Sequence, residues 1–147
     1  MKLRISMLFL VAACALLTPA MAGQPIKVTL PADLQGDLGG VPYRILVPQN
    51  WNGTLLVYAH GYGESATPPL LAPLPADQNT LFAQGFALAA SRFDGSGWTV
   101  KEGMQSTVAL TAAFNGMVAR PQQTIIWGKS MGGLMALGLA EKFPGHY

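Results

Sequence analysis

The residues best suited to chemistry in this chain form a Gly-Lys-Ser-Met-Gly segment centred on Ser130. An apolar run typical of a strand precedes the segment and an apolar stretch typical of a helix follows it, which is the context that gives a Gly-x-Ser-x-Gly motif its meaning. The turn must reverse the chain within very few residues, so we expect it to strain the Ser130 backbone and to project the hydroxyl outward. Gly128 and Gly132 leave room where side chains would collide, and Gly133 is expected to let the helix lie close to the sheet.

The segment has two other interpretations. A glycine-rich turn that simply begins a buried helix would have the same sequence, and this alternative stays open. A phosphate-binding loop needs a further glycine five positions before the glycine of Gly-Lys-Ser. That position is Gln123, so the pattern fails at its first residue and the Gly-Lys-Ser tripeptide is coincidental.

Apolar periodicity predicts alternating strands and helices around the motif. Strands are expected over residues 26–30, 41–47, 54–59, 86–91 and 124–127, and helices over residues 78–84, 102–118 and 131–142. Asp77 is the expected cap of the first helix and Gly85 its terminator. Residues 31–40 are expected to form a loop. The proline-rich residues 68–75 are expected to form a surface connection, with the wall of a binding pocket as the alternative. The order of elements predicts an α/β fold with a mostly parallel sheet, an N-terminal antiparallel strand pair and helices on both faces.

The composition indicates one folded domain. The chain has 147 residues, of which 50% are hydrophobic and 11% charged, so it does not have the composition of a disordered tail. The formal net charge of +2 comes from Lys2 and Arg4, and the remaining basic and acidic residues balance. This balance argues against nucleic acid as a partner. A single cysteine excludes a disulfide framework within the chain and a metal site built from several thiolates.

Residues 1–22 are expected to be a signal peptide rather than part of the fold. A basic start, an apolar run over residues 5–17 and an Ala-Met-Ala end have the form of an export signal. The run is short for a membrane-spanning helix and Pro19 interrupts its end, which disfavours an anchor. A lipoprotein signal acylated at Cys14 is the alternative. We expect a mature chain that is secreted or periplasmic and has no membrane attachment after cleavage.

The chain resembles the N-terminal half of an α/β-hydrolase-fold enzyme, either a serine esterase or a prolyl oligopeptidase-like hydrolase. The matching features, in chain order, are Asn52-Gly53 before a central strand, His60-Gly61-Tyr62-Gly63 after it, the glycine-rich loop over residues 94–97 and the elbow at Ser130. The resemblance covers most of residues 41–147, and the elbow is its most specific part. It implies that residues 23–147 are the N-terminal part of a hydrolase domain whose C-terminal part is missing.

The resemblance also implies roles for individual residues. Ser130 would be the nucleophile that attacks a carbonyl carbon. The backbone N–H groups of Met131 and Tyr62 would form the oxyanion hole, and the Tyr62 side chain could line the acyl pocket. The reaction would proceed through an acyl-enzyme without metal or organic cofactor. The implied partner is therefore a small-molecule ester or a peptide substrate.

A serine nucleophile needs an adjacent base, and the chain has no good candidate. His146 is expected about 20 Å from Ser130, because about thirteen helical residues at ~1.5 Å each lie between them. His60 is nearer, but the family order of nucleophile, acid and then histidine implies a structural role for it. Asp94 is expected to be a turn residue, and Lys129 is expected to face solvent or substrate.

These observations favour a secreted serine hydrolase that acts on esters, present here as a fragment without the acid and histidine of its triad. The strand over residues 124–127 would then be an exposed apolar edge, so the chain alone is expected to be insoluble or inactive. Three alternatives remain: a prolyl oligopeptidase-like peptidase, to which the loop over residues 92–98 is similar, an acyltransferase, and a secreted binding module that keeps the fold without the triad.

Overall fold

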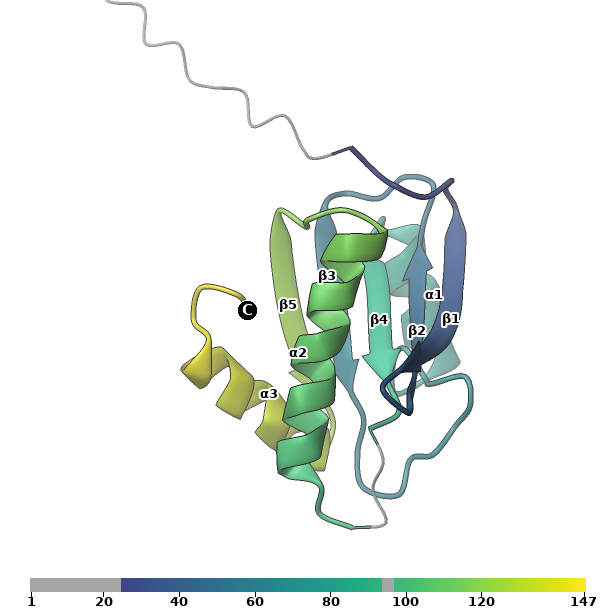
Figure 1. Ribbon diagram of the computed structural model, residues 1–147. Coiled ribbons are helices and arrows are strands. Elements are labelled where there is room, and N and C mark those ends of the chain that lie inside the picture. Colours follow the sequence, from purple (N-terminus) through teal and green to yellow (C-terminus); the bar gives the residue numbers. More distant parts are fainter. Residues whose placement is uncertain (1–24, 94–96) are drawn as a thin grey trace, which may run out of the picture.

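The computed structural model describes residues 25–93 and 97–147 as a five-stranded sheet with helices on both faces (Figure 1). In chain order the elements are β1 (Ala32–Leu38), β2 (Val41–Val47), β3 (Thr54–Ala59), α1 (Pro75–Ala83), β4 (Ala87–Ser91), α2 (Val100–Met117), β5 (Gln123–Gly128) and α3 (Met131–Lys142). The expected signal peptide lies outside the described residues. No helix within them is long and apolar enough to cross a membrane.

The strands lie in the order β1-β2-β4-β3-β5. β2 pairs antiparallel with β1 and with β4, whereas β3 pairs parallel with both β4 and β5. The connection from β3 to β4 contains α1 and the connection from β4 to β5 contains α2, and these helices cover opposite faces of the sheet (Figure 1). The predicted α/β architecture, with its parallel core and its N-terminal antiparallel pair, is confirmed.

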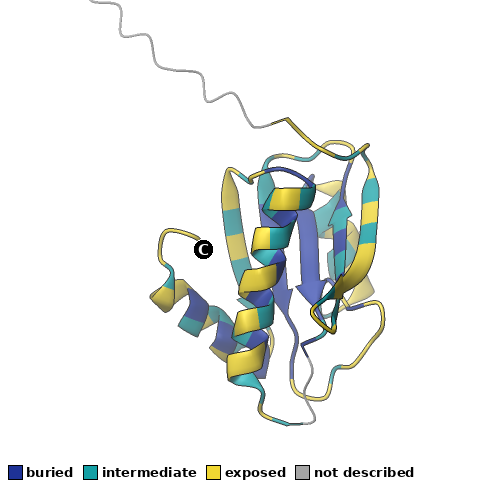
Figure 2. Cartoon of the chain, viewed as in Figure 1, coloured by how far each residue is buried: buried dark blue, intermediate teal, exposed yellow. Residues whose placement is uncertain are grey.

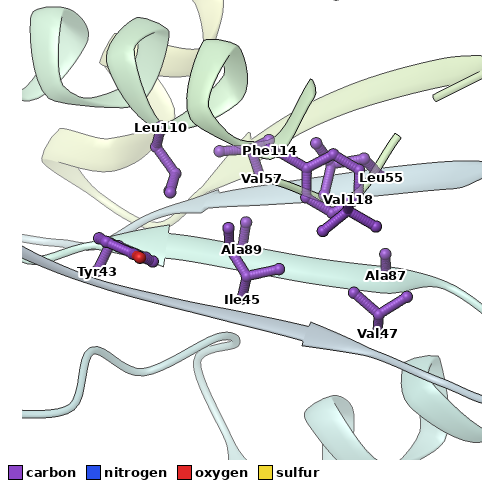
Figure 3. Packing of buried hydrophobic residues seen from close by; sticks show 10 residues of the cluster. All are labelled: Tyr43, Ile45, Val47, Leu55, Val57, Ala87, Ala89, Leu110, Phe114 and Val118. Atoms are coloured by element: carbon purple, nitrogen blue, oxygen red, sulfur yellow. The ribbon is translucent and has the colours of Figure 1, made fainter. Parts of the chain in front are cut away.

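The larger apolar core lies between α2 and the sheet (Figure 3). Leu110, Phe114 and Val118 recur at four-residue spacing, which places them on one face of the helical segment. They pack against strand residues two positions apart, whose side chains share one face of the sheet. These strand residues are Tyr43, Ile45, Val47, Leu55, Val57, Ala87 and Ala89. The apolar side chains of this helical segment therefore form one stripe that covers the sheet.

The intervening strand residues form a second core on the α1 face. Leu56, Tyr58, Leu88 and Ala90 pack there with Leu71. Figure 2 shows the consequence, since β3 and β4 are buried along almost their whole length. Leu71 belongs to the proline-rich stretch and is fully buried, so this stretch is anchored in the core and is more than a surface connection.

The first predicted strand is wrong. Residues 26–30 form no strand, and the Lys27 N–H instead donates to the Val118 carbonyl at 2.8 Å. The strand is β1, inside the segment expected to be a loop. It pairs with β2 across a two-residue turn in which Gly39 and Gly40 have φ of 64° and 89°. Glycine permits such a hairpin turn. The turn pairs β1 with β2 and so stabilises β1 as a strand, whereas the weak apolar alternation over residues 26–30 forms none.

The other elements agree with prediction except at some ends. β2, β3 and α3 match the predicted ranges, whereas α1 begins at Pro75 and not after Asp77. Leu74 is its N-cap residue and Asp77 lies within the first turn, so the predicted cap is wrong. Proline is well suited to the first helical position because its missing N–H would have no partner there. Gly85, with φ of 89°, follows the helix end as predicted.

Candidate active site

The loops after β3 and β5 meet at one edge of the sheet. Ala59 at the end of β3 pairs with Gly128 at the end of β5, so the chain leaves both strands at the same level. A Cβ atom on Gly61 would lie 3.6 Å from the Cβ atom of Ser130, which brings the first loop into contact with the elbow. In open α/β sheets this carboxyl edge is where ligands bind.

Ser130 has an unusual backbone conformation. Its φ of 55° and ψ of −121° make it the one residue other than glycine with positive φ among the described residues. Such conformations cost about 1–3 kcal/mol and persist where the surroundings impose them. The Gly132 N–H donates to the Lys129 carbonyl and the Gly133 N–H to the Ser130 carbonyl, both at 2.9 Å. The predicted strained turn is present, and Ser130 is exposed at its apex.

Two glycines permit the close approach of α3 to the sheet. A Cβ atom on Gly128 would lie 2.7 Å from the Ala59 carbonyl oxygen, and one on Gly132 would lie 2.6 Å from the His60 carbonyl oxygen. Real side chains do not tolerate such distances, so both positions need glycine. A Cβ atom on Gly133 would lie 3.4 Å from its nearest neighbour, the Gly128 carbonyl oxygen. The close approach expected of Gly133 is therefore made by Gly132.

Two backbone N–H groups lie in the segments that meet at Ser130. Met131 is the first residue of α3, and Tyr62 follows the glycine that contacts the elbow. Neither N–H donates a hydrogen bond to a group in the described residues. The amides of the first helical turn have no partner within the helix and favour negative charge. The site thus combines an exposed hydroxyl with free main-chain donors, which is an arrangement suited to a developing oxyanion.

His60 supports the loop that carries Tyr62. Its imidazole is buried and stacks on the Phe93 ring, with centroids 3.7 Å apart and planes within 5°. Nδ1 donates to the Gly61 carbonyl at 2.8 Å, because that carbonyl can only accept. Burial lowers the pKa of His60, although the Gly61 carbonyl and the charge of Glu64 favour its protonated form. This environment agrees with the structural role expected for His60.

A small hollow borders the His60 ring. Its volume is about 10 Å³, which is space for roughly one water molecule. The hollow is lined by His60, Glu64, Ala66, Pro69, Leu70 and Arg92. Arg92 also donates from Nη1 to the Thr67 Oγ1 at 2.8 Å. The proline-rich stretch therefore closes over the end of β4 and over the histidine.

The remaining candidates lie apart from this arrangement. His146 is exposed beyond the C-terminal end of α3, with its ring 6.0 Å from that of Phe143, so it stands at the opposite end of the helix from Ser130. Lys129 is exposed, as expected. Asp94 lies outside the described residues. In the described ranges no three His, Cys, Asp or Glu side chains gather in a way that could hold a metal ion.

An aromatic pair beside the elbow was not expected from the sequence. Trp98 is 73% exposed and Tyr62 is 59% exposed, and their ring centroids lie 6.2 Å apart at an angle of 38°. The sequence pattern indicates Trp98 only as part of a glycine-rich loop. The signal that could have revealed it is a large aromatic residue among small and polar ones, shortly after β4. This strand runs parallel to β3 and ends at the edge of the sheet where the Ser130 turn lies.

Comparison with known proteins bears on the fold. No protein-family model and no curated protein sequence matches the chain. Three solved structures that match are a protein from Agrobacterium vitis S4 assigned as a hydrolase, the epoxide hydrolase VrEH1 from Vigna radiata, and Est1E from Butyrivibrio proteoclasticus. Their TM-scores are 0.56, 0.55 and 0.53, and their identities to this chain are 18%, 14% and 18%.

These structures are longer than the chain. The matches cover 84%, 77% and 78% of this chain but only 48%, 36% and 47% of the respective structures. The chain thus spans between about a third and a half of their length. At such low identity the likeness concerns the fold, which the three structures share. From the strand order, the turn at Ser130 and these matches together, the chain has the α/β-hydrolase fold.

Proposed function

We propose that this chain carries the nucleophile of an exported serine hydrolase, which cleaves esters through an acyl-enzyme on Ser130. The observation that carries the proposal is the strained, exposed Ser130 at the N-terminus of α3. The Met131 and Tyr62 N–H groups beside it have no hydrogen-bond partner among the described residues. Strained residues cluster at active sites, and a surface turn without a chemical role does not need a residue in a strained backbone conformation.

The proposed reaction follows the acyl-transfer pattern. The Ser130 Oγ attacks the ester carbonyl carbon, and its proton passes to a histidine base. The Met131 and Tyr62 N–H groups stabilise the negative charge on the carbonyl oxygen, at roughly 3 kcal/mol for each donor. The intermediate collapses, and the alcohol leaves with the proton from the base. Water then attacks the acyl-enzyme carbonyl and gives a proton to the same base. The base returns this proton to the Ser130 Oγ as the bond from that oxygen to the acyl carbon breaks, which releases the carboxylic acid and restores the free serine.

We propose that the histidine and the acid of the triad are supplied by a segment outside this sequence. His60 is engaged in supporting the loop after β3, with its ring stacked on Phe93 and its Nδ1 bonded to Gly61. His146 stands at the other end of α3. The other ring nitrogen of His60, Nε2, is buried and has no hydrogen-bond partner among the described residues, so it is not hydrogen-bonded to the Ser130 hydroxyl. The partial coverage of the matched structures is consistent with a further segment.

Export is part of the proposal. Its support is the basic start, the apolar run over residues 5–17 and the Ala-Met-Ala end before Gly23. N-terminal sequencing of the protein recovered outside the cytoplasm should give a chain that begins at Gly23. An acylated N-terminal Cys14 would instead identify a lipoprotein, and an intact Met1 start would contradict cleavage.

Substrate assays on the full-length protein test the reaction class. Chromogenic esters should be hydrolysed, and Ser130→Ala should lower kcat/KM by about 10⁴-fold or more, as the loss of a nucleophile does. Lys142→Ala, at the exposed end of α3, is the control and should behave as the wild type. Hydrolysis of chromogenic peptides but not esters would favour the peptidase. Absence of turnover with both substrate classes would favour a binding module.

A further inference from the structure

We propose that Tyr62 and Trp98 form an aromatic platform that selects esters carrying a planar aromatic group. The inference rests on the proposed function, because it specifies the substrate class of the Ser130 site. The platform consists of these two side chains only. They are exposed by 59% and 73%, and their ring centroids lie 6.2 Å apart.

The loop that carries Tyr62 contacts the turn of the nucleophile. Tyr62 directly follows Gly61, whose Cβ position is 3.6 Å from the Ser130 Cβ atom. Tyr62 also contributes the second proposed oxyanion donor, so a substrate carbonyl held there lies within a few bonds of the tyrosine ring. Trp98 comes from the separate segment that leads into α2, and its ring centroid lies 6.2 Å from that of Tyr62.

The pairing of these rings, and not their exposure alone, indicates a ligand. Single exposed apolar side chains are ordinary on protein surfaces, but these two large rings come from different loops and lie together, and the loop of Tyr62 contacts the turn of Ser130 through Gly61. Tyrosine and tryptophan offer large, rigid faces, and their interaction with another ring is more favourable than the burial of apolar area alone would give. We therefore infer that the bound group is an aromatic ring rather than an aliphatic chain.

The ring geometry defines how the ligand lies. A ring inserted between two others would need roughly 3.5 Å between carbon atoms on each side, and the centroid separation of 6.2 Å with a tilt of 38° is too small for that. The substrate ring must lie across the exposed faces of the pair. The side of the ester that carries the ring, acyl or alcohol, then depends on the direction in which the carbonyl enters.

Labelling of the full-length protein with two matched fluorophosphonates tests the platform. One probe carries a phenylethyl group and the other a cyclohexylethyl group, so that they differ in aromaticity and not in length. The wild type should react about threefold to tenfold faster with the phenyl probe, as expected for one aromatic contact. Trp98→Leu should bring the ratio of the two rates to about one, and Trp98→Phe should retain most of the preference. Val108→Ala, an exposed apolar position on α2, should keep the wild-type ratio.

The outcomes separate the two proposals. Labelling at equal rates by both probes would overturn the platform and leave the serine hydrolase standing. A preference that Trp98→Leu preserves would also overturn it, because the selection would then lie elsewhere. Absence of labelling by either probe would overturn the proposed function and the platform together.

Matched esters identify the side of the substrate on the platform. Methyl 3-phenylpropanoate carries its ring on the acyl side, and 2-phenylethyl acetate carries it on the alcohol side. The larger loss of kcat/KM in Trp98→Leu should mark the side that the platform binds. Equal kcat/KM for wild type and Trp98→Leu with both esters would contradict the inference.

Discussion

At the scale of single residues, main-chain geometry rather than a side-chain contact holds Ser130 in place. Ser130 caps α3 without a side-chain hydrogen bond, in a conformation with φ of 55° and ψ of −121°. The main-chain bonds around it run through Lys129, Gly132 and Gly133. The side chain can therefore be replaced without loss of the interactions that shape the turn, which makes two substitutions at this position informative.

Ser130→Gly and Ser130→Ala should both abolish turnover but differ in stability. Glycine adopts positive φ without the penalty of a Cβ atom, whereas alanine keeps that penalty. We expect Ser130→Gly to be more stable than Ser130→Ala by about 1 kcal/mol in the free energy of unfolding. Chemical denaturation of the two full-length variants measures this difference. Equal stabilities would mean that the turn is not strained at Ser130.

His60 should make stability depend on pH. Burial lowers its pKa below the ordinary value of 6.5, so the folded protein binds this proton less readily than the unfolded chain does. Stability is then fully present above the unfolded pKa and declines as the pH falls below it toward the folded pKa. His60→Asn retains a donor to the Gly61 carbonyl but does not titrate. Denaturation midpoints at about pH 7.5 and pH 5.5 should therefore differ less in the variant than in the wild type.

The control for this prediction is His146, which is exposed beyond the C-terminal end of α3. His146→Asn should keep the wild-type pH dependence. If His60→Asn also keeps it, the imidazole is not the group responsible.

The sequence predicts the single residues of the elbow better than those that surround it. Ser130 and Met131 follow from a local motif whose meaning depends only on the strand before it and the helix after it. Tyr62 follows from the resemblance of the segment after β3. The contact between Tyr62 and Trp98 could not be predicted, because it depends on how two separate loops fold back over the sheet edge.

At the scale of elements, the site depends on how closely α3 approaches β3. The helix packs against the end of β3 through Gly132, where a Cβ atom would lie 2.6 Å from the His60 carbonyl oxygen. Gly133 in the same turn meets only ordinary contact at 3.4 Å. These neighbouring glycines therefore separate the effect of close packing from the effect of helix propensity.

Gly132→Ala should destabilise the fold, whereas Gly133→Ala should not. The new methyl group at residue 132 meets backbone carbonyls that cannot move aside, and overpacking of this kind costs about 1–3 kcal/mol or more. At residue 133 the gain in helix propensity, up to about 1 kcal/mol, can be realised. Thermal unfolding of both full-length variants measures the contrast. Similar melting temperatures would contradict the close packing of α3 on β3.

Element prediction succeeded where periodicity is strong and failed where a turn decides the structure. The two-residue alternation of β2 and the apolar run of β3 are local patterns, and burial on one or both faces explains them. β1 was missed because Gln35, Gly36 and Asp37 interrupt its apolar pattern. The Gly39-Gly40 pair was the available signal, since it forms the hairpin turn that sets the β1–β2 register.

At the scale of the whole molecule, one side of the sheet carries exposed apolar residues. β5 is an edge strand among the described residues, and Ile125 on it is 39% exposed. On α3, which packs against β5, Leu134 and Leu137 are 55% and 72% exposed. Figure 2 shows that exposed positions recur along both elements, in contrast to the buried β3 and β4. Unpaired apolar edges of this kind promote association between chains.

Residues 23–147 produced alone should aggregate. We expect most of this polypeptide in the insoluble fraction, and a double substitution, Ile125→Lys with Leu137→Lys, should raise the soluble fraction because charge at an edge opposes pairing. Leu74→Lys, at an exposed apolar position before α1, is the control and should change little. A soluble, active monomer of the unsubstituted chain would contradict the prediction.

Covalent trapping decides whether Ser130 is the nucleophile. The full-length protein is incubated with a fluorophosphonate, digested and analysed by peptide mass spectrometry, with Ser130→Ala treated in parallel. We expect one adduct, on the hydroxyl of Ser130, and none in the variant. An adduct on another residue, or an unmodified Ser130 in a protein that hydrolyses esters, would contradict it.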